Sequence, residues 1–140
     1  MYNPDADALY EGVSELINDL AKRYTLVLVS LAKSDTPQGR RQKIQESGIA
    51  QYFKMILVGG EDKNEMYEKV LTDMKIKSEE VLIVDDRTVR GIAWGNRRGA
   101  TTVWLRRGKF ADELPTKETG NPTFTINDVR ELKEYLRKKA

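Results

Sequence analysis

The sequence contains no cysteine and no histidine among its 140 residues. The absence of cysteine excludes disulfide bonds, thiolate metal sites and cysteine catalysis in this chain. The absence of histidine removes the usual general base near neutral pH and the commonest metal ligand. Any chemistry of the chain must therefore come from carboxylates, Lys, Arg, Ser, Thr or Tyr.

Long apolar runs and a strong charge of one sign are also missing. No window holds 18 apolar residues, so no transmembrane helix is predicted, and the N-terminal residues lack a signal-peptide pattern. The formal net charge is only +2, and no basic block alternates with aromatic residues. We therefore expect a cytoplasmic protein without a membrane or nucleic-acid partner.

What is present is an alternation of apolar strands and amphipathic helices, in a length that suits one domain. Strands are predicted at 25–29, 54–58, 81–85, 101–105 and 123–126, and helices at 9–23, 40–47, 64–74, 89–98 and from 127 or 128 onward. This order predicts a single α/β domain over residues 1–140, a Rossmann-like three-layer sandwich with a mainly parallel sheet. Residues 1–8 are polar and are expected to be flexible.

The stretch VLIVDD, from Val81 to Asp86, is the strongest functional signal. Its apolar part predicts a strand buried on both faces, and Asp85 and Asp86 follow where that strand ends. Ligands bind beyond the carboxyl ends of strands in such sheets, and Mg²⁺ suits two adjacent carboxylates that would otherwise repel each other. The alternative is that Asp85 only ends the strand and Asp86 caps a helix that begins near Thr88.

Three further polar residues follow other predicted strands. Ser30 ends the first clear strand, Lys63 follows the second and opens a helix, and Arg106 follows the fourth. Because carboxyl ends of parallel strands meet at one edge, a hydroxyl, an ammonium and the acid pair can form a phosphate and metal site there, and Arg106 can hold a second anionic group. The alternatives are a turn-forming serine and solvated basic side chains.

The order and spacing of these residues resemble the haloacid dehalogenase superfamily of aspartyl-phosphate hydrolases, from about Leu9 to the end. Ser30 corresponds to its phosphoryl-binding Ser or Thr, and Lys63 in DKNEMYEKVL corresponds to the Lys that steadies the charged intermediate. The stretch VLIVDDRTVRGIAWGNRRGATTVWL resembles the metal motif with its following helix and strand. The resemblance implies a phosphatase acting on a phosphorylated small molecule, with Ser30 and Lys63 as catalytic residues and Asp86 as the main Mg²⁺ ligand beside Asp85.

The sequence departs from the family pattern at two places. A second family acid often follows the metal motif, but that region reads Val89-Arg90-Gly91, which predicts weak or lost Mg²⁺ binding. The family's nucleophile lies in a DxDx[TV] motif after a first strand. Asp5 and Asp7 imitate the spacing of its two acids, but no apolar strand precedes them. We therefore expect the first core strand and the nucleophilic Asp to be missing.

The missing strand has a structural consequence, because in the family it lies between the strands that match 25–29 and 81–85. Buried groups without hydrogen bonds cost roughly 1–3 kcal/mol each, against a domain stability of about 5–15 kcal/mol. Either the two strands close together, or another copy or a complementing chain supplies the strand, or the chain is a fragment or a reorganised relative.

Two functional hypotheses remain. The first is a phosphatase-like core that is inactive alone for want of the nucleophile, and the second is a non-enzymatic domain that binds a phosphorylated ligand or a protein. The string LIVDDRTVR also resembles the start of a response-regulator receiver domain. That hypothesis fails because the later strands, which run into Arg106 and Asn127, do not end in a phosphoacceptor Asp.

Overall fold

The computed structural model describes residues 2–3, 8–32, 36–60 and 62–139. The chain divides into two compact units, Met1–Tyr67 and Glu68–Ala140, and the boundary falls inside helix α3 (Lys63–Met74). Each unit contains parallel strands and helices, which confirms the predicted α/β class. The expectation of one domain over the whole chain stays a prediction.

The first unit begins with a short antiparallel pair, β1 (Tyr2–Asn3) and β2 (Ala8–Leu9). The sequence predicted a helix from residue 9, but helix α1 spans only Val13–Ala21. Leu9 is paired in the β1–β2 ladder, and Gly12 adopts a left-handed φ of 85° that separates this strand from the helix. Residues 4–7, and with them Asp5 and Asp7, lie outside the described residues.

Two parallel strands form the sheet of the first unit, β3 (Val27–Leu31) and β4 (Met55–Gly59). Their register places Ser30 beside Val58. Helix α2 (Pro37–Glu46) and the 3-10 turn η1 (Ala50–Tyr52) connect them, and α2 packs against β4. This strand–helix–strand unit leaves Ser30 one residue before the end of β3.

Helix α2 begins three residues before the predicted start at Arg40. The Thr36 side chain accepts a hydrogen bond from the Gly39 N–H at 2.9 Å, and Pro37 occupies the first helical position. Both features favour a helix start at this point. The first backbone N–H of a helix has no partner within the helix, so proline, which lacks this group, loses no hydrogen bond there, and the threonine side chain accepts the N–H of a residue in the first turn.

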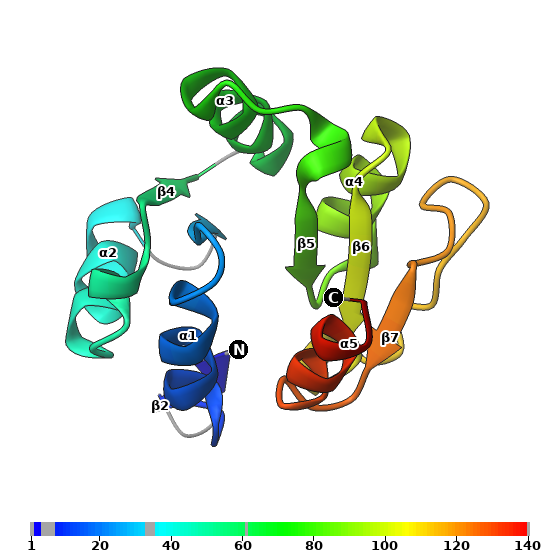
Figure 1. Cartoon of the computed structure of the whole chain (residues 1–140). Coiled ribbons are helices and arrows are strands. Elements are labelled where there is room, and N and C mark those ends of the chain that lie inside the picture. The colour runs from blue at the N-terminus through cyan, green and yellow to red at the C-terminus, as the bar shows by residue number, and fades with distance from the viewer. Residues whose placement is uncertain (1, 4–7, 33–35, 61, 140) are drawn as a thin grey trace. The chain divides into compact units, whose positions relative to one another are not determined.

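Three parallel strands form the sheet of the second unit, in the order β5 (Leu82–Asp85), β6 (Thr101–Leu105) and β7 (Phe124–Ile126). Figure 1 shows them side by side. Strand β6 has the predicted bounds, and the others begin one residue later than predicted. The remaining elements are the 3-10 turns η2 (Ser78–Glu80) and η4 (Gly108–Phe110), the π-helix η3 (Thr88–Ile92), and helices α4 (Ala93–Arg98) and α5 (Glu131–Lys139).

Strand β6 is the centre of this second sheet and carries much of the unit's core. Val103 is fully buried, and Gly95 of α4 packs directly against the strand. A Cβ atom on Gly95 would lie 2.5 Å from Cγ2 of Thr102 and 3.2 Å from Cδ1 of Ile83. Only glycine therefore allows α4 to lie this close to the sheet.

Each of the two sheets has an edge that no other described strand pairs with. Among the described strands, β3 pairs only with β4, and β5 pairs only with β6. These are the strands between which the family resemblance places a first strand. How that place is filled stays a prediction.

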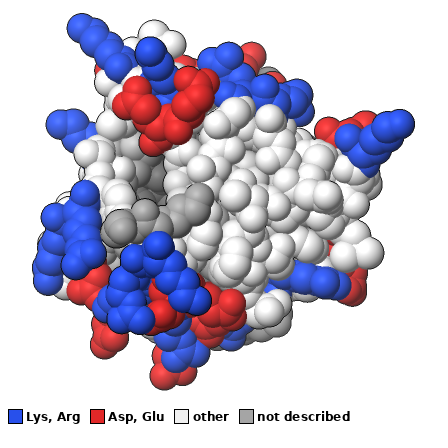
Figure 2. Space-filling model, turned by 45° about the vertical axis from the view of Figure 1, so that its right-hand side comes forward, with Lys and Arg blue, Asp and Glu red and all other residues white. Residues whose placement is uncertain are grey.

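On the face drawn in Figure 2, Lys and Arg lie beside Asp and Glu, and a broad area between these groups carries neither sign of charge. None of the helices in the described part of the chain is both long and apolar enough to cross a membrane.

Candidate functional site

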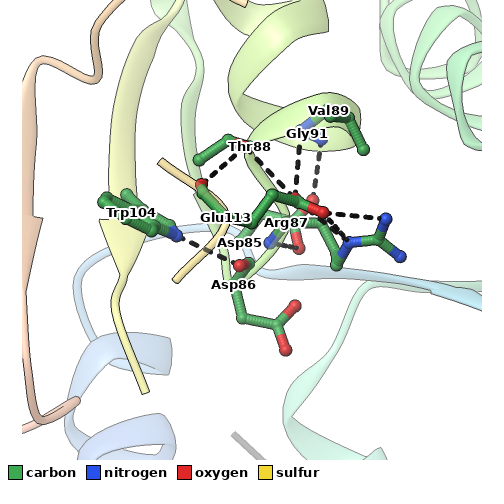
Figure 3. A network of polar contacts seen from close by, with 8 residues as sticks. All are labelled: Asp85, Asp86, Arg87, Thr88, Val89, Gly91, Trp104 and Glu113. Atoms are coloured by element: carbon green, nitrogen blue, oxygen red, sulfur yellow. Dashed lines mark hydrogen bonds and ion pairs between the residues drawn. The ribbon is translucent and has the colours of Figure 1, made fainter. Parts of the chain in front are cut away.

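The acid pair lies at the carboxyl end of β5, as the sequence predicted. Asp85 is the last residue of the strand and is buried, with only 7% of its surface exposed, and Asp86 opens the following loop. Figure 3 shows that the two carboxylates point in different directions, with Asp85 turned toward η3 and Asp86 turned away from it. The two acids therefore have different surroundings despite being adjacent.

The Asp85 carboxylate holds the backbone of the loop that follows it. One oxygen accepts the Gly91 N–H at 2.7 Å and the other accepts the Arg87 N–H at 3.2 Å. Hydrogen bonds from N–H groups to an ionised carboxylate are stronger than neutral ones. Asp85 thus ties the start of the loop and the π-helix η3 to the end of β5.

Asp86 is held through its backbone. Its carbonyl oxygen accepts a hydrogen bond from the indole Nε1 of Trp104 at 3.1 Å, and Trp104 is only 2% exposed in strand β6. The side chain points away from this contact (Figure 3). The neighbouring strand therefore fixes the position from which the Asp86 carboxylate is presented.

Glu113, from the long loop after β6, binds three successive residues that follow the acid pair. Its carboxylate lies 3.1 Å from both Nε and Nη2 of Arg87, and it accepts hydrogen bonds from the Thr88 hydroxyl at 3.1 Å and the Val89 N–H at 3.4 Å (Figure 3). The Arg87 guanidinium also lies over the ring of Phe110, 3.9 Å from its centroid. Two loops distant in the sequence are joined beside Asp86.

The ionisation of Glu113 reflects these contacts. Burial raises the pKa of Glu113, but the hydrogen bond and charge of Arg87, with the bonds from Val89 and Thr88, outweigh burial and leave this pKa below its ordinary value of 4.5. Glu113 is therefore an anion at neutral pH and forms an ion pair with Arg87.

The region in which the second family acid is expected, Val89 to Gly91, contains no carboxylate. Within it, Gly91 gives its N–H to Asp85. Among the described residues no group of three or more Asp and Glu side chains could share a metal ion.

Arg90 adds a positive charge to this neighbourhood. Burial lowers the pKa of Arg90 and the charge of Arg87 lowers it further, whereas three carboxylates act in the opposite direction: Asp85, Asp86 and Glu113. A guanidinium stays charged at neutral pH. Arg90 therefore competes electrostatically with a cation at the acid pair.

Ser30 and Lys63 belong to the first unit. The Ser30 hydroxyl accepts a hydrogen bond at 3.0 Å from Nη1 of Arg40, a residue of the first turn of α2. Lys63 is the first residue of α3, and its Nζ lies over the ring of Tyr67, 5.8 Å from the centroid. The structure thus shows the local contacts of Ser30 and of Lys63. That these two residues form one site with Asp85 and Asp86 stays a prediction.

The arginines after β6 have different surroundings. Nε of Arg106 donates to the Ala111 carbonyl at 2.8 Å, and its guanidinium lies 5.4 Å from the ring centroid of Trp104. Arg107 instead forms an ion pair with Asp128 at 3.3 Å. Arg106 thus lies beside the residue that holds Asp86 and remains a predicted ligand for an anionic group.

Sequence reasoning did not find Glu113 or Arg40. Both lie in charged stretches that resemble solvated surface, and their partners are 26 and 10 residues away in the sequence. The runs around them carry no motif, so only the folded chain reveals these contacts.

The model of the haloacid dehalogenase-like hydrolases matches residues 3–105. The chain belongs to this family. A glyceraldehyde 3-phosphate phosphatase from Methanopyrus kandleri is 32% identical over 71% of this chain and 45% of its own length. A phosphoserine phosphatase from Thermus thermophilus is 25% identical over 80% of this chain and 45% of its own length.

Solved structures show the same fold. The family hydrolase YfnB from Bacillus subtilis, solved bound to magnesium, matches with a TM-score of 0.75 and 23% identity over 93% of this chain and 57% of its own. An L-2-haloacid dehalogenase from Xanthobacter autotrophicus matches with a TM-score of 0.76 and 13% identity. The match covers 95% of this chain and 62% of the dehalogenase chain. The chain spans about half the length of the curated relatives it matches.

Proposed function

We propose that this chain binds a phosphorylated small molecule together with Mg²⁺, as the core of a phosphatase of the haloacid dehalogenase-like family. The observation that carries the proposal is the presentation of Asp86 at the end of a parallel strand. Asp85, Trp104 and Glu113 hold the loop around it from three directions. The naming of the two relatives above as phosphatases supports the choice of substrate class.

The donor set fits a weakly held magnesium ion. Mg²⁺ prefers oxygen ligands and is commonly bound through one or two carboxylates, water and substrate phosphate. Asp86 is the main ligand in this proposal, Asp85 holds the loop next to it, and bound Mg²⁺ would supply charge that neutralises phosphoryl oxygens. The small number of nearby acids and the charge of Arg90 account for weak affinity.

Three other side chains have roles on the phosphate group in this proposal. The Ser30 hydroxyl donates a hydrogen bond to a phosphoryl oxygen, and the Lys63 ammonium neutralises its charge. Arg106 holds a second anionic group of the substrate. These roles follow the family resemblance and the positions of the three residues, with Ser30 near the end of β3, Lys63 after β4 and Arg106 after β6.

We propose that the 140-residue chain has no turnover by the family's covalent route when it is alone. That route needs a carboxylate in line with phosphorus, and no Asp in the sequence follows a buried strand at the place in the chain order where the family has its nucleophile. Ser30 is no substitute, because the chain contains no histidine to activate it. A second copy or a complementing chain is the partner expected to supply the missing strand.

A second function, binding a phosphorylated ligand without catalysis, has its own support. The region in which the family's second acid is expected, Val89 to Gly91, holds no carboxylate, and its Gly91 N–H binds Asp85. A site without that acid can still hold phosphate through Ser30, Lys63 and a hydrated cation.

Trapping an aspartyl-phosphate mimic tests the proposal. The chain is incubated with Mg²⁺, fluoride and beryllium, with a generic phosphate ester in a parallel assay and the oligomeric state measured by light scattering. We expect phosphate binding without a stoichiometric adduct or turnover. An adduct on any Asp, or Mg²⁺-dependent turnover abolished by Asp5→Asn or Asp7→Asn, would show that a nucleophile is present.

A further inference from the structure

The hydrogen bond between Ser30 and Arg40 fixes the direction in which the serine can donate. Arginine has only N–H donors, so the Ser30 oxygen must be the acceptor of this bond. A serine hydroxyl has one donor hydrogen besides its two acceptor positions. Within the described residues no other hydrogen bond of this hydroxyl is found, so its hydrogen can turn toward a ligand.

The Arg40 guanidinium keeps most of its capacity to donate. One of its five N–H groups binds Ser30, and in the described part of the chain no carboxylate forms an ion pair with it. The first turn of α2 contains no acidic residue, and Arg41 follows directly. Arg40 as a whole is half-buried, and its guanidinium lies beside the serine, where an anion would meet both groups.

We propose that Ser30 and Arg40 form a two-point site for one phosphate group, in which Arg40 is a substrate-binding residue. The serine donates its O–H to one phosphate oxygen, and Arg40 donates remaining N–H groups to others. The planar guanidinium matches two oxygens of a phosphate, which a lysine does not. The site lies wholly in the first unit and rests on the proposed function only for the identity of the anion.

Arg40 has a second effect in this site through the serine. By donating to Ser30 it occupies an acceptor position, which favours a hydroxyl rotation that directs the hydrogen to the ligand. Removing either side chain therefore weakens the contribution of the other. Their effects on phosphate binding should be less than additive in the double variant.

Binding of inorganic phosphate to the 140-residue chain, measured by isothermal titration with and without Mg²⁺, tests this site. The variants are Arg40→Gln, Arg40→Lys, Ser30→Ala and the double variant Ser30→Ala/Arg40→Gln. The control is Arg41→Gln, which removes the same charge from the next residue, whose Nη1 donates to the Ile56 carbonyl at 3.4 Å. Thermal unfolding checks that each variant is folded.

We expect Arg40→Gln to weaken phosphate binding at least about tenfold, as loss of a charge-assisted hydrogen bond does. Arg41→Gln should change it less than about twofold, since exposed charges are screened. Arg40→Lys should fall between the parent and Arg40→Gln.

The outcomes separate this site from the proposed function. Equal binding by the parent and a folded Arg40→Gln variant would overturn the two-point site while leaving the proposed function standing. Phosphate binding that depends on Arg40 but is unaffected by Mg²⁺ and Asp86→Asn would support the site and count against the magnesium-dependent function. A parent chain that binds no phosphate would overturn both.

Discussion

Arg87 and Glu113 form an ion pair with Nη2 and Oε2 3.1 Å apart, and it joins the loop after β5 to the loop after β6. The two side chains are only 17% and 22% exposed, and Phe110 covers the guanidinium. Because Arg87 directly follows Asp86, this contact connects the fold of a distant loop to the presentation of the candidate metal ligand.

Glu113→Gln should destabilise the chain by about 1–2 kcal/mol at pH 7, between the values for exposed and buried ion pairs. The amide keeps the shape of the side chain but loses the charge that Arg87 faces. Urea unfolding followed by circular dichroism measures the change. Glu118→Gln, an exposed substitution in the same loop, is the control and should have almost no effect. Equal stabilities of the two variants would show that the ion pair contributes little.

The stability that Glu113 contributes should depend on pH. Its pKa in the folded chain lies below the ordinary value of 4.5, so the unfolded chain takes up its proton first as pH falls. The contribution is therefore fully present above about pH 4.5 and is lost as pH falls through the folded pKa. The stability difference between the parent and Glu113→Gln should shrink in this range. A difference that is constant from pH 7 to pH 3 would contradict the lowered pKa.

Asp86→Asn should abolish what Mg²⁺ binding the parent shows, because an amide oxygen lacks the charge that attracts a hard cation. Isothermal titration with MgCl₂ measures the affinity, which we expect to be weak even in the parent. Asp112→Asn, an exposed acid in the loop after β6, is the control and should bind like the parent. If Asp86→Asn also binds like the parent, the metal site lies elsewhere.

Asp85→Asn should act mainly on stability, in contrast to the neighbouring substitution. The amide replaces one acceptor oxygen by an NH₂ group, which then faces the N–H of Gly91 or Arg87. Losing such a buried hydrogen bond costs about 1–3 kcal/mol. Urea unfolding of the two variants side by side measures this, and Asp86→Asn should remain close to the parent. A larger loss of stability in Asp86→Asn would reverse the roles assigned to the two acids.

The sequence alone determined the parallel α/β class, the bounds of β6 and the position of the acid pair at the end of β5. These features follow from local patterns, since buried parallel strands are continuous apolar runs and carboxylates stand out where such a run ends. The motifs around Ser30, Lys63 and Asp86 were equally visible, and they identified the family that the comparisons confirmed.

Only the tertiary structure decided which of two adjacent acids faces the backbone and which faces outward. The same holds for the pairing of Arg87 with Glu113 and of Ser30 with Arg40, because these partners meet through the packing of separate loops and helices. Element starts near Leu9 and Arg40 were mispredicted for a related reason. Capping at Thr36 and strand pairing at Leu9 are decided by hydrogen bonds, which apolar periodicity does not report.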